Sequence, residues 1–229
     1  MNKQPLAVVT GGSSGIGRAI AARLAGESYK VINADIRSPV GDVPGNCIYH
    51  KCDVTNRNHI MELSRLVQVS GIPEVLVLNA GKGIHEKLRE GDPEKWFEVI
   101  NLNICGTLRV LRAVLPFMQK GNVIFISSVS STHPYPYGGV YSATKSALDT
   151  IAETLRQEEL PDIRVTVISA GVVQTSFFRE MISGSQTVES IGWGALDPEE
   201  VAGAVAFALQ QRDNTAIHQI IIRPSGQTL

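Results

Sequence analysis

The sequence predicts an α/β fold, a doubly wound parallel sheet with helices on both faces. Apolar runs typical of buried strands alternate with helical patterns along the 229 residues. A glycine-rich turn lies between the first of these strands and the first helix. Small and polar residues follow several strands, at the edge where open α/β sheets bind their ligands.

Size and composition predict a single domain that spans residues 1–229. The chain is 43% hydrophobic, which is enough to bury one full core. No internal repeat, low-complexity tract or linker divides it.

Charge and cysteine content exclude several classes of function. The net charge of −1 offers no electrostatic footprint for nucleic acid or for an acidic membrane. No apolar stretch approaches the ~20 residues of a membrane span, and residues 1–5 lead into the first strand without a targeting region. Cys47, Cys52 and Cys105 lack metal-ligand spacing, so we expect reduced thiols, no metal site and a soluble, cytoplasmic protein.

The first strand, residues 6–9, leads into a glycine turn at residues 10–17 and then a helix. Gly11, Gly15 and Gly17 follow a Gly-x-x-x-Gly-x-Gly spacing rather than the commoner Gly-x-Gly-x-x-Gly. Glycines let the chain turn tightly and bring backbone N–H groups, with the positive end of a helix, against a pyrophosphate. The context predicts a dinucleotide site, and the alternative is an ordinary glycine turn.

The second strand, residues 30–34, ends at Asp35. This carboxylate follows the glycine turn by about 20 residues, where it can accept hydrogen bonds from the adenosine ribose hydroxyls. It would repel a 2′-phosphate and therefore favours NAD over NADP. Arg37, two residues later, is a natural phosphate partner and leaves NADP as the alternative.

The middle of the chain predicts one shortened connection. Residues 36–46 are rich in turn residues and lack a helical period, so we expect a loop in place of a crossover helix before the strand at 47–50. A helix at 56–68 and a strand at 74–78 follow. That strand ends in Asn79-Ala-Gly81, small residues where a cofactor could lie close to the backbone.

A long helix is predicted from Asp92, an N-cap followed by proline, to Leu115. It carries Asn103, a polar residue on a largely apolar helix. Without other evidence, Asn103 is interpreted as a hydrogen-bonded core amide. After it come strands at 122–126, 164–168 and 219–222, and helices that begin near Tyr141 and at Asp197.

The clearest chemical signal lies between residues 127 and 145. Ser128 follows a buried strand, and Tyr141 and Lys145 are four residues apart, so they share one helix face. A phenol has a pKa of ~10, and a nearby ammonium is expected to lower it and make Tyr141 usable as an acid or base. Ser128 could hold a substrate oxygen, which indicates carbonyl–alcohol chemistry. Alone, Tyr-x-x-x-Lys is a weak signal, and a lone match is interpreted as a half-buried tyrosine and a solvated lysine.

With these motifs in register, the chain resembles the short-chain dehydrogenase/reductase family in its short single-domain form. The matching positions are the turn Thr10 to Gly17, Asn79 to Gly81, Asn103 before Gly106, Ser128, Tyr141 and Lys145. The resemblance implies a Rossmann-like, NAD(P)-dependent oxidoreductase that interconverts a secondary alcohol and a ketone or aldehyde by direct hydride transfer.

The resemblance also implies residue roles. Tyr141 would be the general acid/base, Ser128 would polarise the substrate oxygen, Lys145 would lower the pKa of Tyr141 and bind the nicotinamide ribose, and Asn103 would hold a relay water. The dinucleotide would contact Gly11, Ser13, Ser14, Gly15, Ile16, Gly17, Asp35, Asp53, Val54, Asn79, Ala80, Gly81, Tyr141, Lys145, Gly171, Val173 and Thr175. Family members commonly pair their two long helices, so a homodimer or homotetramer is expected.

The chain departs from the family pattern at three places. Ala170 stands where proline usually precedes Gly171, Leu78 stands where asparagine usually precedes Asn79, and the helix after Asp35 is reduced. None of these departures touches the four catalytic positions, but the third alters the adenine side.

Substrate contacts are expected from loops at 82–87, 130–139 and 176–193, whose aromatic residues suggest an apolar surface for a small carbonyl or alcohol. Those aromatic residues could equally pack a lid or a subunit contact. Two other functions stay open: a non-catalytic dinucleotide sensor or scaffold, and a lyase or dehalogenase. The intact tyrosine and lysine argue against the first, and the intact glycine turn against the second.

Overall fold

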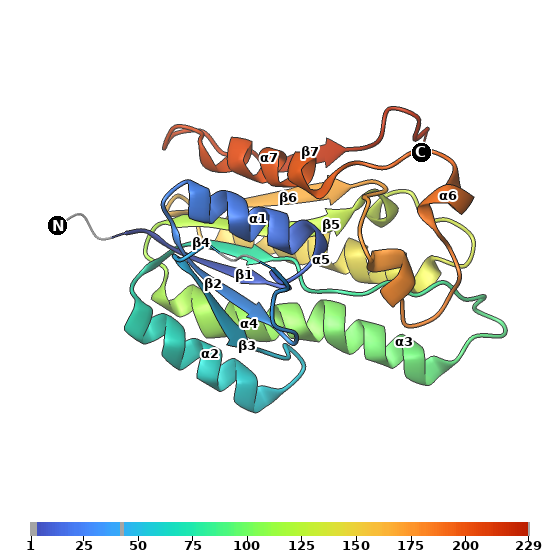
Figure 1. Ribbon diagram of the computed structural model, residues 1–229, viewed down its shortest axis with the longest axis horizontal. Coiled ribbons are helices and arrows are strands. Elements are labelled where there is room, and N and C mark those ends of the chain that lie inside the picture. Colours follow the sequence, from blue (N-terminus) through green and yellow to red (C-terminus); the bar gives the residue numbers. More distant parts are fainter. Residues whose placement is uncertain (1–3, 42–43, 229) are drawn as a thin grey trace.

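The computed structural model describes residues 4–41 and 44–228 and contains a seven-stranded parallel sheet of order β3-β2-β1-β4-β5-β6-β7 (Figure 1). The strands are β1 Leu6–Thr10, β2 Lys30–Asp35, β3 Cys47–Lys51, β4 Pro73–Leu78, β5 Gly121–Ser128, β6 Ile163–Ala170 and β7 Gln219–Ile222. The chain adds β2 and β3 on one side of β1 and then returns to place β4 on the other. This reversal creates a crevice at the carboxyl ends of β1 and β4, where such sheets bind ligands.

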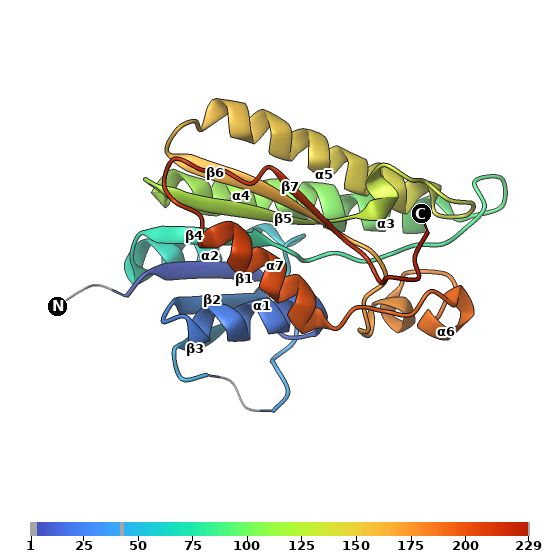
Figure 2. The ribbon, with the colours of Figure 1, turned by 90° about the horizontal axis from the view of Figure 1, so that it is seen from above.

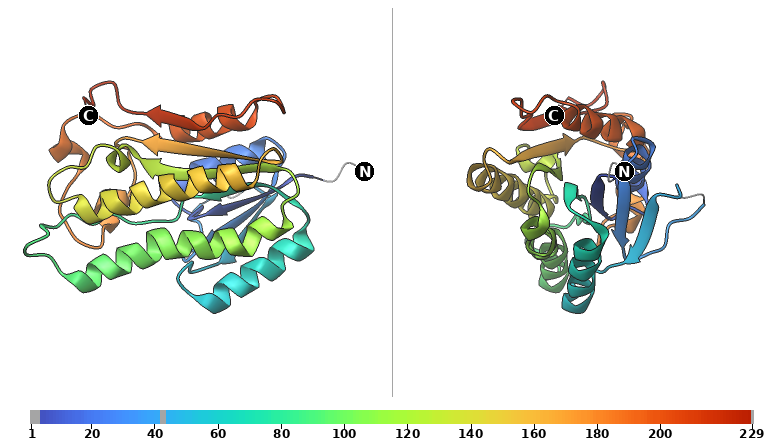
Figure 3. Two further views of the ribbon diagram at one scale, coloured as in Figure 1. Left: turned by 180° about the vertical axis from the view of Figure 1, so that it is seen from behind. Right: turned by 90° about the vertical axis from the view of Figure 1, so that its left-hand side faces the viewer.

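Helices cover both faces of the sheet, which confirms the predicted doubly wound α/β fold (Figures 2 and 3). The helices are α1 Gly15–Gly26, α2 Arg57–Ser70, α3 Pro93–Ile100, α4 Thr107–Val114, α5 Gly139–Glu158, α6 Val188–Ile191 and α7 Pro198–Leu209, with short helical turns η2 Leu115–Phe117, η3 Val129–Ser131 and η4 Phe177–Glu180. The buried residues of α1 and α7 join one core cluster, and those of α2, α4 and α5 join another.

The sheet is buried on both faces because its strands are almost continuously apolar. Val8 packs in one core cluster and its neighbour Val9 in the other, as alternating side chains of a central strand must. Phe125 of β5 is the largest fully buried side chain. Because a packed core covers each face of the sheet, the strand ends at its carboxyl edge are held in fixed positions.

The connection between β2 and β3 is short, as the turn residues predict. Its described residues, 36–41 and 44–46, contain no helix. β3 is therefore an edge strand that no crossover helix covers, and its residues are half-buried or exposed.

The predicted long helix is present but not uniform. The π-helix η1, Asn101–Gly106, joins α3 to α4 within a single helical stretch, Pro93–Phe117. Among the described residues this 25-residue stretch is the one helix long and apolar enough to cross a membrane, so the expectation that no stretch approaches that length was wrong. It packs on α5, α2 and β4, and 44% of its most apolar part is buried within the protein.

Candidate active site

A cavity of about 1070 Å³ opens at the carboxyl edge of the sheet. It is lined by residues that end or follow the six strands β1 to β6, and by α5 and the segment after β6. Most of the predicted site residues line it: Gly11, Ser14, Gly15, Ile16, Asp35, Asp53, Val54, Asn79, Ala80, Gly81, Ser128, Tyr141, Lys145, Gly171, Val173 and Thr175. Ser13, Gly17 and Asn103 do not line it, and they support residues that do.

The glycine turn is built so that two backbone segments touch. A Cβ atom added to Gly17 would lie 2.1 Å from the carbonyl oxygen of Gly11 and 2.5 Å from Nδ2 of Asn79. That amide nitrogen donates to the carbonyl oxygens of Thr10, at 3.0 Å, and Gly11, at 3.2 Å. The hydroxyl of Thr10 accepts from the backbone N–H groups of Asn79 and Ala80. The turns after β1 and β4 are thus locked together.

The turn fits a pyrophosphate. Gly11 and Gly15 adopt φ values of +67° and +49°, which L side chains rarely adopt. Ser14 occupies the N-cap of α1, and its side chain accepts no hydrogen bond from the first turn. The N-terminal N–H groups of this 12-residue helix therefore face the cavity without a side-chain cap, as an anion site requires.

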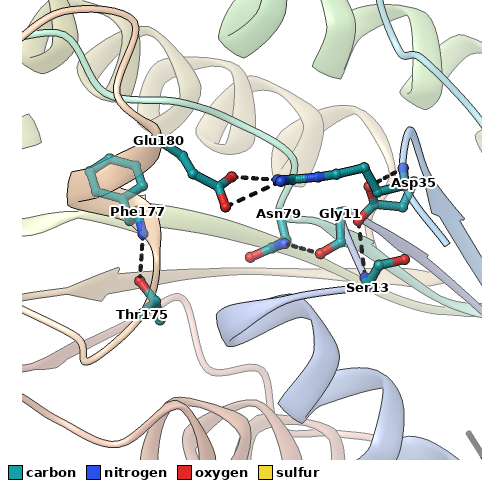
Figure 4. Close-up of polar contacts among 8 residues, drawn as sticks. Gly11, Ser13, Asp35, Asn79, Thr175, Phe177 and Glu180 are labelled. Atoms are coloured by element: carbon teal, nitrogen blue, oxygen red, sulfur yellow. Dashed lines mark hydrogen bonds and ion pairs between the residues drawn. The ribbon is translucent and has the colours of Figure 1, made fainter. Parts of the chain in front are cut away.

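Asp35 ends β2 with a buried carboxylate. Its Oδ2 accepts from the backbone N–H of Ser13 and its Oδ1 from that of Arg37, both at 3.0 Å (Figure 4). A carboxylate offers about four acceptor positions, so acceptor capacity remains for ribose hydroxyls. The guanidinium of Arg37 forms an ion pair with Glu180 of η4.

Ser128 and Tyr141 meet inside the cavity, one from the end of β5 and the other from the first turn of α5. Their hydroxyls lie close enough to interact, because Ser128 lowers the pKa of Tyr141. The ring of Tyr141 packs on Phe177, with 5.7 Å between the ring centroids. The cavity wall therefore presents two adjacent hydroxyls against an apolar surface, a suitable place for a carbonyl or alcohol oxygen.

The electrostatics of Tyr141 differ from the prediction. Burial raises the pKa of Tyr141 above its usual value, and the hydrogen bond from Ser128 lowers it only in part. The predicted net lowering of this pKa is wrong for this structure, because burial is the largest effect; the Nζ atom of Lys145 lies 5.8 Å from the ring centroid and donates to the carbonyl oxygen of Ile126 at 2.8 Å. Tyr141 is therefore a neutral hydrogen-bond donor at pH 7.

Lys145 is a buried cation, and this is unusual for a lysine. Burial lowers its pKa from 10.5 to about 8, with partial opposition from Asp149. The ammonium form still predominates at pH 7. The protein thus keeps a charge in its interior that its fold alone does not need.

Lys145→Met is expected to stabilise the cofactor-free protein at pH 7 by up to roughly 3 kcal/mol, since burial of the ammonium costs about that much. Between pH 8 and 10.5 the unfolded wild-type protein keeps a proton that the folded one loses, so wild-type stability rises with pH in this window. Urea unfolding at pH 7 and 9.5 should show that rise in the wild type and not in the variant. Lys51→Met, at an exposed position, is the control. A less stable variant with an unchanged pH dependence would contradict this account.

Asn103 lies in the π-helix η1 and is buried. Its Oδ1 accepts from the N–H of Lys82, and its Nδ2 donates to the carbonyl oxygen of Lys82 and to Thr144, each at 3.0 Å. The side chain is thus a satisfied core amide that fixes the segment after β4 beside Gly81. The relay water stays a prediction.

Three further residues shape the cavity: Ser130 and Tyr135, from the loop expected at 130–139, and Gln227, which was not predicted. Ser130 accepts a hydrogen bond from Ser128 at 3.1 Å and pairs with the hydroxyl of Tyr135, whose ring lies against Gly138. Gln227, from the tail after β7, accepts from the N–H of Val172 at 3.1 Å and so holds the turn where proline is lacking. No sequence pattern pointed to Gln227, since its partner is 55 residues away.

The three loops expected to contact substrate contribute unequally. Tyr135, Phe177 and Trp193 line the cavity, so part of its surface is aromatic. His85 lies against the rings of Tyr135 and Tyr137, with centroids 5.9 and 5.2 Å away, so some of these aromatic residues pack on one another.

Among the residues that the structure describes, no group of three or more His, Cys, Asp or Glu side chains could hold a metal ion. All three cysteines are free thiols. Burial raises the pKa of Cys52 to about 12, which makes that thiol unreactive.

Comparison with known proteins gives consistent matches. The sequence profile of the family described as short chain dehydrogenase matches residues 5–186. An uncharacterized oxidoreductase of Staphylococcus saprophyticus is 34% identical over 236 residues, covering 96% of this chain and 97% of that protein. An uncharacterized oxidoreductase of Staphylococcus aureus is 32% identical over 230 residues, covering 96% of each.

Similar solved structures carry nicotinamide dinucleotides. An alcohol dehydrogenase of the archaeon Thermococcus sibiricus, complexed with 5-hydroxy-NADP, superposes with a TM-score of 0.85 at 28% identity, covering 98% of each chain. The closed form of a serine dehydrogenase complexed with NADP+ superposes with a TM-score of 0.87 at 28% identity, covering 98% of this chain and 96% of that one.

Proposed function

This chain belongs to the short chain dehydrogenase family of oxidoreductases, and from that premise we propose that it interconverts a secondary alcohol and a ketone or aldehyde with a nicotinamide dinucleotide. One observation carries the proposal. Ser128 and Tyr141 line the same cavity as the glycine turn, and Lys145 lies one helical turn from Tyr141. A substrate oxygen at the two hydroxyls and a dinucleotide along the turn would share this one space.

When bound, the dinucleotide supplies or accepts a hydride. The chain's own residues manage the oxygen and its proton. Because Tyr141 is neutral at pH 7, it can donate its proton to a carbonyl oxygen as that oxygen gains negative charge. Ser128 donates a second hydrogen bond to the same oxygen and so stabilises the developing charge.

Lys145 supports this chemistry through its charge. Its ammonium lies 5.8 Å from the centre of the Tyr141 ring and stabilises the phenolate that forms when the proton leaves. The same ammonium can donate to ribose hydroxyls. Asn103 acts through position, because it fixes the Lys82 backbone next to Gly81.

The dinucleotide would be NAD by preference. The Asp35 carboxylate retains acceptor capacity for two ribose hydroxyls and would repel a 2′-phosphate. Two of the similar structures were solved with NADP-type molecules, which makes NADP the alternative.

A substrate screen tests the proposal. The purified protein is mixed with ketones, aldehydes and secondary alcohols and with each of the two dinucleotides, and the absorbance of the reduced nicotinamide is followed. We expect oxidation or reduction of members of this panel, faster with NAD(H) than with NADP(H). Turnover of the panel compounds without any change in the nicotinamide would contradict hydride transfer and favour a lyase or dehalogenase.

A further inference from the structure

An ion pair crosses the cavity between two distant segments. Arg37 follows β2, and Glu180 is the last residue of η4, 143 positions later. Nη1 of Arg37 donates to Oε1 of Glu180 at 3.2 Å, and Nη2 donates to Oε2. Figure 4 shows this two-pronged contact between Glu180 and the segment that follows Asp35. Both side chains line the cavity.

The two ends belong to different halves of the site. Arg37 donates its backbone N–H to Asp35, the residue expected to bind the adenosine ribose. Glu180 shares η4 with Phe177, which packs on Tyr141. The pair therefore ties the adenosine side to the segment that covers the reacting groups.

The pair also decides which charges a dinucleotide meets on the adenosine side. Among the described residues, Arg37, Lys82 and Lys145 are the lysines and arginines that line the cavity, and of these Arg37 is the one that hydrogen-bonds to Asp35. A 2′-phosphate beside the Asp35 carboxylate would need that guanidinium as its partner. Glu180 occupies two guanidinium nitrogens in the geometry that a phosphate would use.

We propose that Glu180 is a specificity-determining residue, which holds Arg37 away from a 2′-phosphate and so makes the site prefer NAD over NADP. The inference rests on the proposed function, since it concerns the dinucleotide of that same cavity. The Glu180 carboxylate and a 2′-phosphate compete for one guanidinium. Asp35 alone would repel the phosphate, and Glu180 removes the group that could offset this repulsion.

Glu180→Gln tests the inference. Titration of nicotinamide fluorescence gives the Kd for NADH and for NADPH without need of a substrate. Because the variant frees Arg37 for a charge-assisted contact, the Kd for NADPH should fall by about tenfold. The Kd for NADH should change by less than about twofold, since NADH places no phosphate beside Arg37.

Two further variants serve as matched controls. In Arg37→Gln, adding Glu180→Gln should bring no gain in NADPH binding, because the guanidinium is gone. Asp213→Asn removes the same charge from another exposed ion pair, with Lys120, outside the cavity. This variant should leave both Kd values unchanged, which separates a local effect from one of net charge.

The outcomes are distinct. If Glu180→Gln raised the Kd for NADH and the Kd for NADPH by the same factor, the ion pair would serve to hold the cavity closed over either dinucleotide. That result would overturn the selectivity role. An unchanged ratio of the two Kd values would overturn it as well, while leaving the proposed function intact. A wild-type protein that binds neither dinucleotide would instead overturn the proposed function, and the inference with it.

Discussion

Tyr141→Phe should lower kcat by roughly 10²- to 10⁴-fold while leaving the Kd for the dinucleotide nearly unchanged, because it removes only the group that transfers the proton. The phenyl ring can keep its packing on Phe177 and in the small core cluster with Ile84 and Val99. The fold and the glycine turn should therefore be unaffected. Initial rates with any compound that the screen identifies, together with NADH titration, measure the two effects separately.

Tyr137→Phe is the matched control for this change. Tyr137 is 45% exposed and does not line the cavity, so removal of its hydroxyl should leave the rate unchanged. A Tyr141→Phe protein with an undiminished rate would refute the assignment of Tyr141 as general acid. Ser128 would then be the remaining hydroxyl beside the substrate oxygen.

Gly17→Ala should abolish dinucleotide binding and destabilise the protein by roughly 1–3 kcal/mol or more, as overpacking against rigid atoms does. The added Cβ would lie 2.1 Å from the carbonyl oxygen of Gly11, a backbone atom that can move only if the turn opens. Opening the turn would break the hydrogen bonds from Asn79 to Thr10 and Gly11. Urea unfolding and NADH titration of the variant test both effects.

Gly26→Ala, in the same helix, separates this contact from the general effect of the substitution. An added Cβ at Gly26 meets no atom within 4 Å. Alanine there should be neutral or stabilise the protein by up to about 1 kcal/mol, since glycine costs helix stability. If Gly17→Ala and Gly26→Ala changed stability and NADH binding to the same extent, the close approach of the two turns would not explain why glycine is needed at position 17.

The fold could be predicted because the local sequence patterns of this chain agree with its overall architecture. Apolar runs marked the strands, and the predicted face of α2, formed by Ile60, Leu63 and Val67, is the face it buries. The loop that replaces a crossover helix followed from its turn residues. The π-helix around Asn103 could not be predicted from the sequence, because its residues also fit an ordinary α-helix. The side chain of Asn103 is fixed by tertiary contacts with Lys82 and Thr144, which no local pattern marks.

The parts of the site that consist of residues close together in the sequence could be predicted. The parts that depend on contacts between distant residues, or on burial, could not. The glycine turn and the Tyr141–Lys145 pair are local patterns, and the structure brings both to the cavity. The pKa of Tyr141 depends on the balance between burial and nearby polar groups, and the spacing of residues in the sequence does not give that balance. The ion pair of Arg37 and Glu180 joins residues 143 positions apart, and no local pattern marks it.

The measurement that tests the central claim most directly is titration of the wild-type protein with NADH and NADPH, followed by nicotinamide fluorescence. The cavity between the glycine turn and Lys145 predicts saturable binding of about one dinucleotide per chain, tighter for NADH. Tighter binding of NADPH would show that Arg37 outweighs Asp35 and would leave the reaction class intact. Failure of both to bind would contradict the assignment of this cavity to a nicotinamide dinucleotide.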